Sequence, residues 1–573
     1  MKNHEASFAA SPSFLLPPTS LPEFTVPKLA APQLVWRNAA IAADLDLDAY
    51  AYCAPHLDDS SAAFLPQTKT FQAERYGGIG VASNGGGVRC GLDGAIQVKG
   101  TGRNGLLGKR TDFNHSNGGA SLEEGVREAI WGEVAAMALP YGAARVHGIL
   151  ATGTRTYFQG AGAEDGMIPR VLILRQALLR PAHYMRAIDC DLSDPAIELH
   201  CSDAARTRAA VAEMDLGLST LVGRQPTNRH DPSFINEGLL EMARRFACQL
   251  ATSNVKRIPH GALNCSNIAL DGRFLDFGTM TAISDYGRVI VIKGQPDIWR
   301  THTYFKSTFY NLAFYLRHYL PGAGGAEIIS GARLNAHFLA HYHTRLTMEF
   351  LKLTGIPEAS LLQNGSVKLA DLWRSIQGII ARKNREPFQM PQMPETMGAF
   401  NLNAIFRAAC LCRDATQMED ELQSLLDDSS LRRQFIEAYA AAREHYLSSL
   451  PATVRAQASF TMIMEAMRRN TPFMALCRNQ LEPAILALQR QPDSISAVPG
   501  FIDHLLRQAR TLLAETGVAG VDLSWYAGRP LYATPTAVTG HDACPVALDA
   551  AISELDPLHF SDQQKQMISI LCH

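Results

Sequence analysis

Residues 260–278 read His260-Gly-Ala-Leu-Asn264-Cys-Ser266-Asn267-Ile-Ala-Leu-Asp-Gly-Arg-Phe-Leu-Asp276-Phe-Gly278, and the expected fold is built outward from them. Two short apolar runs flank Asp271-Gly272, a dipeptide that favours a tight two-residue hairpin turn. Because a hairpin returns its ends to one another, the Asn267 amide and the Asp276 carboxylate should converge. Oxygen ligands of these two kinds suit an octahedral Mg²⁺ that carries nucleotide phosphates. The stretch therefore predicts a metal site. A surface hairpin with a polar rim is the alternative.

Composition excludes several classes of protein. The chain has 573 residues, 47% of them hydrophobic, which is enough for a large core. Its 53 basic and 55 acidic residues give a net charge of −2. The sequence has no dense stripe of Lys and Arg, so we do not expect nucleic acid to be its partner. The eleven cysteines are scattered and do not form a zinc or disulfide framework. No apolar run approaches a membrane span, and the N-terminal apolar patch is too short for a secretion signal. We therefore expect a soluble, cytoplasmic protein without a membrane partner.

Glycine is concentrated between residues 71 and 100, where Gly85-Gly86-Gly87-Val-Arg89 is the densest part. Glycines among β-type residues predict tight turns whose N–H groups can approach phosphate. Neither the Walker nor the Rossmann spacing is present. Gly86 and Gly87 are thus candidate nucleotide-binding residues, and a glycine-rich hairpin without a ligand is the alternative.

A lysine and a glutamate stand where a phosphate-orienting pair would. Lys99 closes a strand-like run, and a helix is expected to begin at Ser121, with Glu124 completing a capping box. Glu128 follows on that helix. A strand lysine and a helix glutamate, together with the tripeptide Asp276-Phe-Gly278 after a hairpin, form the arrangement of protein kinases. A surface salt bridge is the alternative for the pair.

The pattern along the chain predicts an α+β, protein-kinase-like bilobal fold. It has a small β-rich N-lobe, a large α-helical C-lobe and a helical C-terminal extension. The expected divisions are a disordered N-terminus at 1–24, an N-terminal extension at 25–70, the N-lobe at 71–184, the C-lobe at 185–390 and the C-terminal extension at 391–573.

Several strings resemble the selenoprotein O family and occur in its order. They are Gly85-Gly-Gly-Val-Arg89, Gln97-Val-Lys99-Gly-Thr-Gly102, Gly125-Val-Arg-Glu128, Gly142-Ala-Ala-Arg145, the stretch from His260 through Asn267 to Gly278, Ser284-Asp-Tyr286, Gln295-Pro296 and Asn311-Leu-Ala313. The resemblance covers residues 25–320 well and the remaining tail loosely.

The resemblance implies a pseudokinase fold that binds ATP in an inverted orientation. It also implies transfer of AMP to protein hydroxyls with release of pyrophosphate. Carried over residue by residue, Lys99 and Glu128 resemble the phosphate-orienting pair, and Asn267 and Asp276 resemble the ligands of Mg²⁺ or Mn²⁺. Three arginines fall where family arginines approach the phosphates, the last with a shifted register: Arg89, Arg175 and Arg180.

One departure concerns catalysis. Ser266 stands where the family has its catalytic-base aspartate. Because a serine hydroxyl does not accept a proton near neutral pH, the rate enhancement from general-base catalysis, about 10²–10⁴-fold, is lost. Another carboxylate, Asp271 or Asp285, could replace it, or a loose transition state could need no base. An acceptor that is already ionised, such as a carboxylate, would need none either. The family's paired redox cysteines have no counterpart in the loop after Asp276.

Three function classes remain. The first is an ATP- and metal-dependent nucleotidyltransferase whose acceptor, a protein side chain or a small molecule, the sequence does not identify. The second is a nucleotide-binding pseudoenzyme that acts as a scaffold. The third is a small-molecule kinase or glutamylase-like enzyme on the same fold. Retention of both metal ligands and the Lys99–Glu128 pair favours the first, since a scaffold does not require a complete set.

Overall fold

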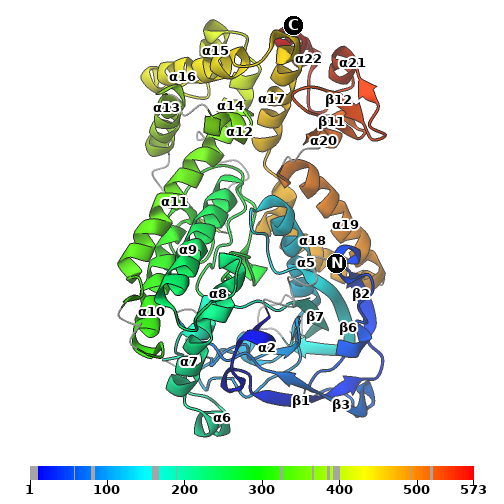
Figure 1. The fold of residues 1–573 in the computed structure, drawn as a ribbon. Helices are drawn as coiled ribbons and strands as arrows, with labels where there is room; N and C mark the ends of the chain where they lie inside the picture. The colour runs from blue at the N-terminus through cyan, green and yellow to red at the C-terminus, as the bar shows by residue number, and fades with distance from the viewer. Residues whose placement is uncertain are drawn as a thin grey trace.

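A computed structural model of the chain describes residues 11–56, 58–78, 84–157, 167–188, 190–322, 327–363, 367–383, 387–390, 401–491, 493–515 and 520–572. It is a mixed α/β structure. An antiparallel sheet formed by the N-terminal third lies beside a large group of helices, and further helices and a small sheet lie at the far end of the molecule (Figure 1).

The main sheet has seven strands in the order β1-β3-β4-β5-β7-β6-β2, and every neighbouring pair is antiparallel. The strands are β1 Glu23–Leu29, β2 Gln33–Arg37, β3 Phe64–Gln72, β4 Cys90–Asp93, β5 Ile96–Lys99, β6 Val146–Tyr157 and β7 Met167–Gln176. The N-terminal extension expected at 25–70 therefore supplies β1, β2 and β3 to the same sheet as the expected N-lobe.

The register of β5 and β7 sorts their side chains by face. Gln97 pairs with Arg175, and Lys99 pairs with Ile173. Because side chains alternate along a strand, Gln97, Lys99 and Arg175 share one face of the sheet. The apolar residues between them, such as Val98 and Leu174, belong to a separate core cluster on the other face.

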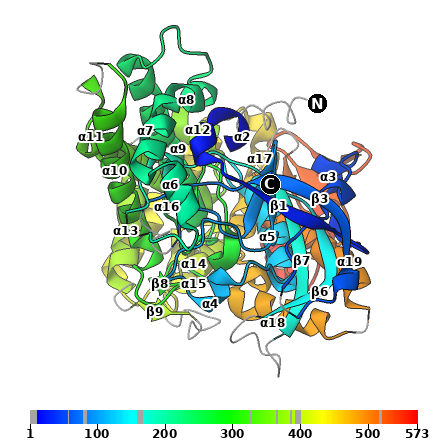
Figure 2. The ribbon, with the colours of Figure 1, turned by 90° about the horizontal axis from the view of Figure 1, so that it is seen from below.

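Helix α5, Leu122–Ala138, packs on β6 and β7. It begins at Ser121, whose hydroxyl accepts the Glu124 N–H at 3.0 Å, as the capping pattern predicts. Its apolar side chains are buried, among them Val126, Ile130 and Trp131. On its other side α5 contacts α18, Arg478–Gln489, and α19, Ser494–Leu513, which lie close to it in two views (Figures 1 and 2).

The central helices pack beside the sheet, and one core cluster continues from α5 into them. The long helix α9, Pro232–Val255, lies against α8 and α11. The helices of this part are α6 Pro195–His200, α7 Asp203–Ala212, α8 Met214–Val222, α9, α10 Tyr304–Tyr319, α11 Gly331–Leu351, α12 Glu358–Gln363 and α13 Val367–Lys383. Two short strands, β8 Val289–Ile290 and β9 Phe388–Gln389, pair in parallel.

The C-terminal part is not wholly helical, which corrects one expectation. Residues 521–546 form a four-stranded antiparallel sheet, in which Leu531, Ala533 and Val538 point into a core. In β11 and β12, buried and partly exposed residues alternate with a period of two, which is the pattern of a strand and not of a helix. The elements are α14 Leu402–Cys410, α15 Ala415–Leu422, α16 Ser429–Ser448, α17 Arg455–Arg469, β10 Val521–Asp522, α20 Ser524–Ala527, β11 Leu531–Ala533, β12 Val538–Gly540, β13 Pro545–Val546, α21 Leu548–Ser553 and α22 Asp562–Cys572.

The N-terminus corrects a second expectation. Disorder was expected for residues 1–24, of which 1–10 lie outside the described residues. Residues 11–24 are ordered: the short helix α2, Pro12–Leu15, is capped by Ser11, and the Ser11 hydroxyl donates to Gly94 O at 2.6 Å. Leu16 and Leu21 are buried in the main core. The apolar residues among the prolines therefore stabilise this segment against the sheet.

Candidate functional site

The hairpin forms at the expected place with a different turn. Ile268 pairs with Phe274, and the Leu275 N–H donates to Asn267 O at 3.0 Å. The turn has three residues rather than two, because Ala269 N–H donates to Arg273 O at 2.8 Å and Gly272 adopts a φ of 94°. This is the glycine-terminated form of a three-residue loop. Asn267 and Asp276 consequently lie next to each other at the open end.

Asp276 has a left-handed backbone, with φ 58° and ψ 73°. This region costs a residue with a Cβ on the order of 1 kcal/mol or more, and such strain gathers at functional positions. His260 contacts the backbone on one side of Asp276 and a side chain on the other: its ring Nε2 lies 2.7 Å from Leu275 O, and its main-chain oxygen accepts from Thr279 Oγ1 at 2.8 Å. Because Nε2 faces a carbonyl, it carries the proton.

Three cations converge on the Asp276 carboxylate. Arg175 Nη1 lies 2.7 Å from Oδ1, Lys99 Nζ lies 3.4 Å from Oδ1, and Arg180 Nη1 lies 3.4 Å from Oδ2. The two arginines are almost fully buried, whereas 28% of the Asp276 side chain is exposed. The carboxylate is thus the part of this group that a ligand from solvent can reach.

Helix α5 supplies two carboxylates to Lys99. Glu128 Oε1 lies 2.5 Å and Glu124 Oε1 lies 2.8 Å from Nζ. Glu128 also binds Arg175 at 2.9 Å, and Glu124 holds Arg89 through two contacts of 2.7 and 2.9 Å. The Lys99–Glu128 pair is therefore present and buried, not a surface salt bridge.

A second group of polar side chains supports the arginines from behind. Gln97 donates to Glu74 and accepts from Arg175 Nε at 2.6 Å. His183 Nδ1 accepts the Arg180 N–H at 2.9 Å, which leaves its Nε2 to face Glu74 at 3.3 Å. Arg180 also lies over the Tyr76 ring, 5.2 Å from its centre. These contacts restrict the positions of Arg175 and Arg180.

The charges of the cluster are nearly balanced. Four cations, Lys99 and three arginines, face Glu124, Glu128 and Asp276, with Glu74 behind them. Burial would raise the pKa of Asp276, but Arg175, Lys99 and Arg180 hold it well below its usual range. Burial likewise opposes ionisation of Glu124, and Arg89 and Lys99 overcome it and lower the pKa of that carboxyl. Burial lowers the pKa of His183 despite Glu74, so this imidazole is neutral at pH 7.

The residues at the open end fit a divalent metal. Asn267 Nδ2 donates to Ala262 O at 2.8 Å, so the amide oxygen faces the other way. That oxygen and Asp276 would provide two hard ligands, and Mg²⁺ takes its others from water and phosphates. In the described part of the chain no group of three or more His, Cys, Asp or Glu could hold a metal ion.

Ser266 and the two alternative bases have partners of their own. The Ser266 hydroxyl donates to Asn264 Oδ1 at 2.6 Å. Asp271 lies at the turn end of the hairpin and binds Arg273 at 2.7 Å. Asp285 accepts the N–H of Tyr286 at 2.7 Å and that of Asn403, at the start of α14, at 3.4 Å. Asp271 thus lies at the end of the hairpin opposite Ser266, and Asp285 is held by backbone N–H groups.

The glycines are held by backbone contacts. A Cβ on Gly86 would lie 1.9 Å from Glu74 O, so close packing explains this glycine. The Gly87 N–H donates to Glu74 O at 3.0 Å and is not directed at a ligand. The expected N–H cradle for phosphate is therefore not formed by Gly87 in this conformation. The neighbouring Gly80 lies outside the described residues.

Two carboxylates in the cluster were missed. Sequence reasoning assigned Glu124 only to the capping box, yet its side chain reaches Arg89 and Lys99. Its position one turn before Glu128 is a signal that could have revealed it. Glu74, which supports Gln97 and His183, has no such signal because its partners are distant in sequence.

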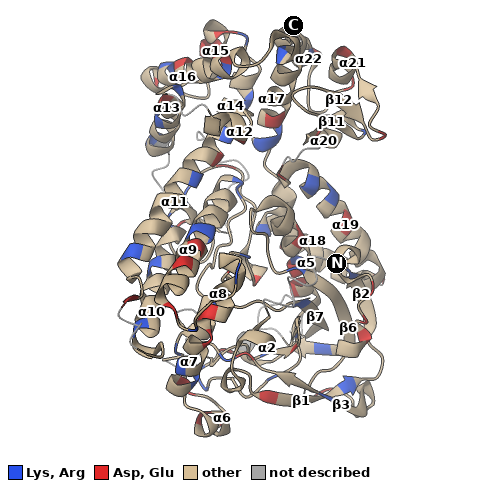
Figure 3. Ribbon diagram, viewed as in Figure 1, with Lys and Arg blue, Asp and Glu red and all other residues tan. Residues whose placement is uncertain are grey.

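No protein-family model matches the chain, and no curated protein matches it. Among the described residues, no helix combines the length and the apolar composition needed to cross a bilayer. In the view of Figure 3, acidic and basic residues are mixed over the described parts of the sheet and the helices. All eleven cysteines are free thiols.

Proposed function

We propose that the protein binds ATP with Mg²⁺ or Mn²⁺ and transfers AMP to an acceptor, in the manner of the selenoprotein O family. The observation that carries the proposal is the convergence of Lys99, Arg175 and Arg180 on Asp276, beside Asn267. Phosphate transfer depends mainly on positioning and charge neutralisation, and buried, preoriented cations supply both.

Charge balance couples the nucleotide to the metal. A triphosphate adds several negative charges to a cluster that is already close to neutral. A divalent cation between Asn267, Asp276 and the phosphates would compensate for them. The cation would supply charge neutralisation. Lys99, Arg175 and Arg180 would orient the phosphates, with Glu124 and Glu128 holding Lys99 in place.

In the proposed reaction, an acceptor oxygen bonds to the α-phosphorus while the bond to the departing pyrophosphate breaks. We infer that Ser266 does not serve as a base, because a serine hydroxyl does not accept a proton near neutral pH; in the structure it donates to Asn264. We therefore favour an acceptor that is already ionised, such as a carboxylate, which would yield an acyl-adenylate or a similar product.

Intact-mass spectrometry after incubation with ATP and Mg²⁺ or Mn²⁺ tests the proposal, together with assays of released pyrophosphate and phosphate. We expect pyrophosphate release and an adduct with the mass of AMP on the protein or on an added acceptor. A phosphate adduct would indicate a kinase instead. The Asp276→Ala variant is the matched control for metal-dependent turnover.

A nucleotide-binding pseudoenzyme is the second candidate, and Ser266 is the observation that favours it. In that case ATP would bind in a metal-dependent way, measured by calorimetry, without pyrophosphate or phosphate release. Absence of ATP binding altogether would contradict both candidates.

A further inference from the structure

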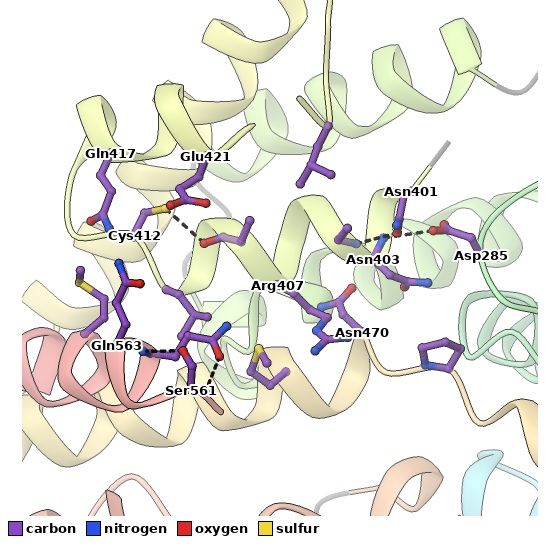
Figure 4. A pocket seen from close by; sticks show the side chains of 18 of the residues that line it. Asp285, Asn401, Asn403, Arg407, Cys412, Gln417, Glu421, Asn470, Ser561 and Gln563 are labelled. Carbon is purple, nitrogen blue, oxygen red and sulfur yellow. Dashed lines mark hydrogen bonds between the residues drawn. The ribbon is translucent and has the colours of Figure 1, made fainter. Parts of the chain in front are cut away.

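A cavity of about 620 Å³ lies away from the charge cluster, in the C-terminal part of the molecule. Its walls come from α14, α15, α17 and α22, and from Ser284 and Asp285 in the segment after the hairpin (Figure 4). This volume is within the range of small-molecule sites, about 300–1,000 Å³. The family resemblance does not extend well to this region, and the proposed function does not use the cavity.

One wall carries a cation for which no carboxylate partner is found in the part of the chain that the structure describes. The Arg407 side chain extends from α14 toward Asn470 (Figure 4). Among the described residues, no ion pair or side-chain hydrogen bond is found for its guanidinium. Most arginines of this part of the chain are engaged: Arg432 binds Glu419, and Arg443 donates to Cys412 O. A guanidinium at the edge of a cavity favours an acidic group in that cavity.

For three buried side-chain oxygens beside the cavity, no donor is found among the residues with a described structure. They are Ser284 Oγ, Asn403 Oδ1 and Asn470 Oδ1, in residues that are 7%, 4% and 0% exposed. The amide nitrogens of both asparagines are committed, Asn403 to Ser284 O and Asn470 to Leu353 O. Buried polar atoms are seldom left unpaired, and each such group marks a place where a ligand or water belongs.

The remaining lining is mixed: Leu411, Met467, Pro472 and Met567 form an apolar part, and polar side chains, including the carboxylates Asp285 and Glu421, form the rest. We propose that this cavity binds a small carboxylate that carries neighbouring N–H or O–H donors on an apolar body. The carboxylate pairs with Arg407, the donors serve the oxygens of Ser284, Asn403 and Asn470, and the apolar body lies against the leucine and methionines.

Four matched probes separate these features: phenylalanine, phenyllactate, hydrocinnamate and phenethylamine. The first two combine a carboxylate with an N–H or O–H donor. Hydrocinnamate lacks the donor and phenethylamine lacks the carboxylate. Calorimetry on the full chain should show saturable binding of phenylalanine or phenyllactate, weaker binding of hydrocinnamate and none of phenethylamine. Whichever of the first two binds more tightly identifies the donor as ammonium or hydroxyl.

Variants locate the binding. Arg407→Gln should weaken it by roughly 10- to 100-fold, the effect of one charged hydrogen bond. Arg433→Gln, which removes an exposed arginine on α16, should leave it unchanged. Ala404→Phe narrows the cavity while keeping Arg407, and should also block binding. Circular dichroism checks that each variant is folded.

Other outcomes would overturn the proposal. Binding that survives both Arg407→Gln and Ala404→Phe lies elsewhere. Binding lost in Lys99→Met belongs to the charge cluster. Equal binding of phenethylamine and phenylalanine would exclude a role for the carboxylate, and no saturable binding of any probe would exclude this class of ligand.

Discussion

Glu124 and Glu128 lie one turn apart on α5, and both contact the Lys99 ammonium, at 2.8 and 2.5 Å. Their second partners differ. Glu128 continues to Arg175, which reaches Asp276, whereas Glu124 continues to Arg89, for which no contact with Asp276 is found among the described residues. Helix α5 therefore holds Arg175 through Glu128 and Arg89 through Glu124. Of these two arginines, Arg175 is the one that contacts the Asp276 carboxylate.

This difference predicts unequal effects of two matched substitutions. Glu128→Gln should reduce turnover more than Glu124→Gln, because it loosens both Lys99 and Arg175. We expect a gap of about tenfold, the size of one charged hydrogen bond. Steady-state pyrophosphate release measures it. Equal losses in both variants, or a larger loss in Glu124→Gln, would contradict the assignment.

Replacing Asp276 by alanine should abolish metal-dependent nucleotide binding. The change removes one metal ligand and leaves Arg175 and Arg180 without their shared anion, so any remaining ATP binding should no longer require Mg²⁺. We expect turnover to fall by about 10²–10³-fold or more. Asp271→Asn, at the opposite end of the same hairpin, is the control. Unchanged metal-dependent binding and turnover in Asp276→Ala would contradict the assignment of Asp276 as a metal ligand.

Lys99→Met keeps the aliphatic stem but removes the charge. Glu124 and Glu128 each retain an arginine, so the protein should fold, with a loss of about 1–3 kcal/mol in the free energy of unfolding. Turnover should be lost. Lys109→Met, at a surface pair with Asp191, should change neither. An active Lys99→Met enzyme would exclude the phosphate-orienting role.

Ser266→Asp tests the acceptor. The new carboxylate would lie beside Asn264, whose amide can turn to donate to it, and would restore the family's base. Transfer of AMP to protein hydroxyls should rise by about 10²–10⁴-fold if a missing base limits it. Mass spectrometry of labelled peptides measures the gain. Efficient labelling of Ser, Thr or Tyr by the native protein would show that the altered-acceptor idea is wrong.

Asp285 predicts a pH dependence of stability. Burial raises its pKa from 3.8 to about 6, so the folded chain binds this proton more tightly than the unfolded chain does. Stability is therefore lost as the pH rises from about 4 to about 6, by about 3 kcal/mol. Asp285→Asn should remove this dependence, measured as the difference from wild type in urea unfolding at pH 4 and pH 7. The control Asp503→Asn, at an exposed position, should leave the pH dependence of stability unchanged.

The hairpin and the cap at Ser121 could be predicted from the sequence because each rests on local spacing, whereas the Lys99–Glu128 pair was expected from the kinase arrangement and the family resemblance. Turn residues, strand alternation and the helical period act over a few residues. The same reasoning assigned the N-terminus to disorder and the last part of the chain wholly to helix. Both errors concern segments whose structure depends on packing against distant partners, such as Leu16 and Leu21 in the main core.

The residue types at the site, and which of them are close along the chain, can be read from the sequence. Tertiary packing is needed for Arg175 and Arg180 to reach Asp276, for Glu124 to share Lys99 with Glu128, and for Glu74 to lie behind them. It also decided that α18 and α19 lie on α5, and that a cavity opens beside Arg407. These relationships join residues up to several hundred positions apart. Sheet register and core packing bring these residues together, and neither can be predicted from patterns that span only a few residues.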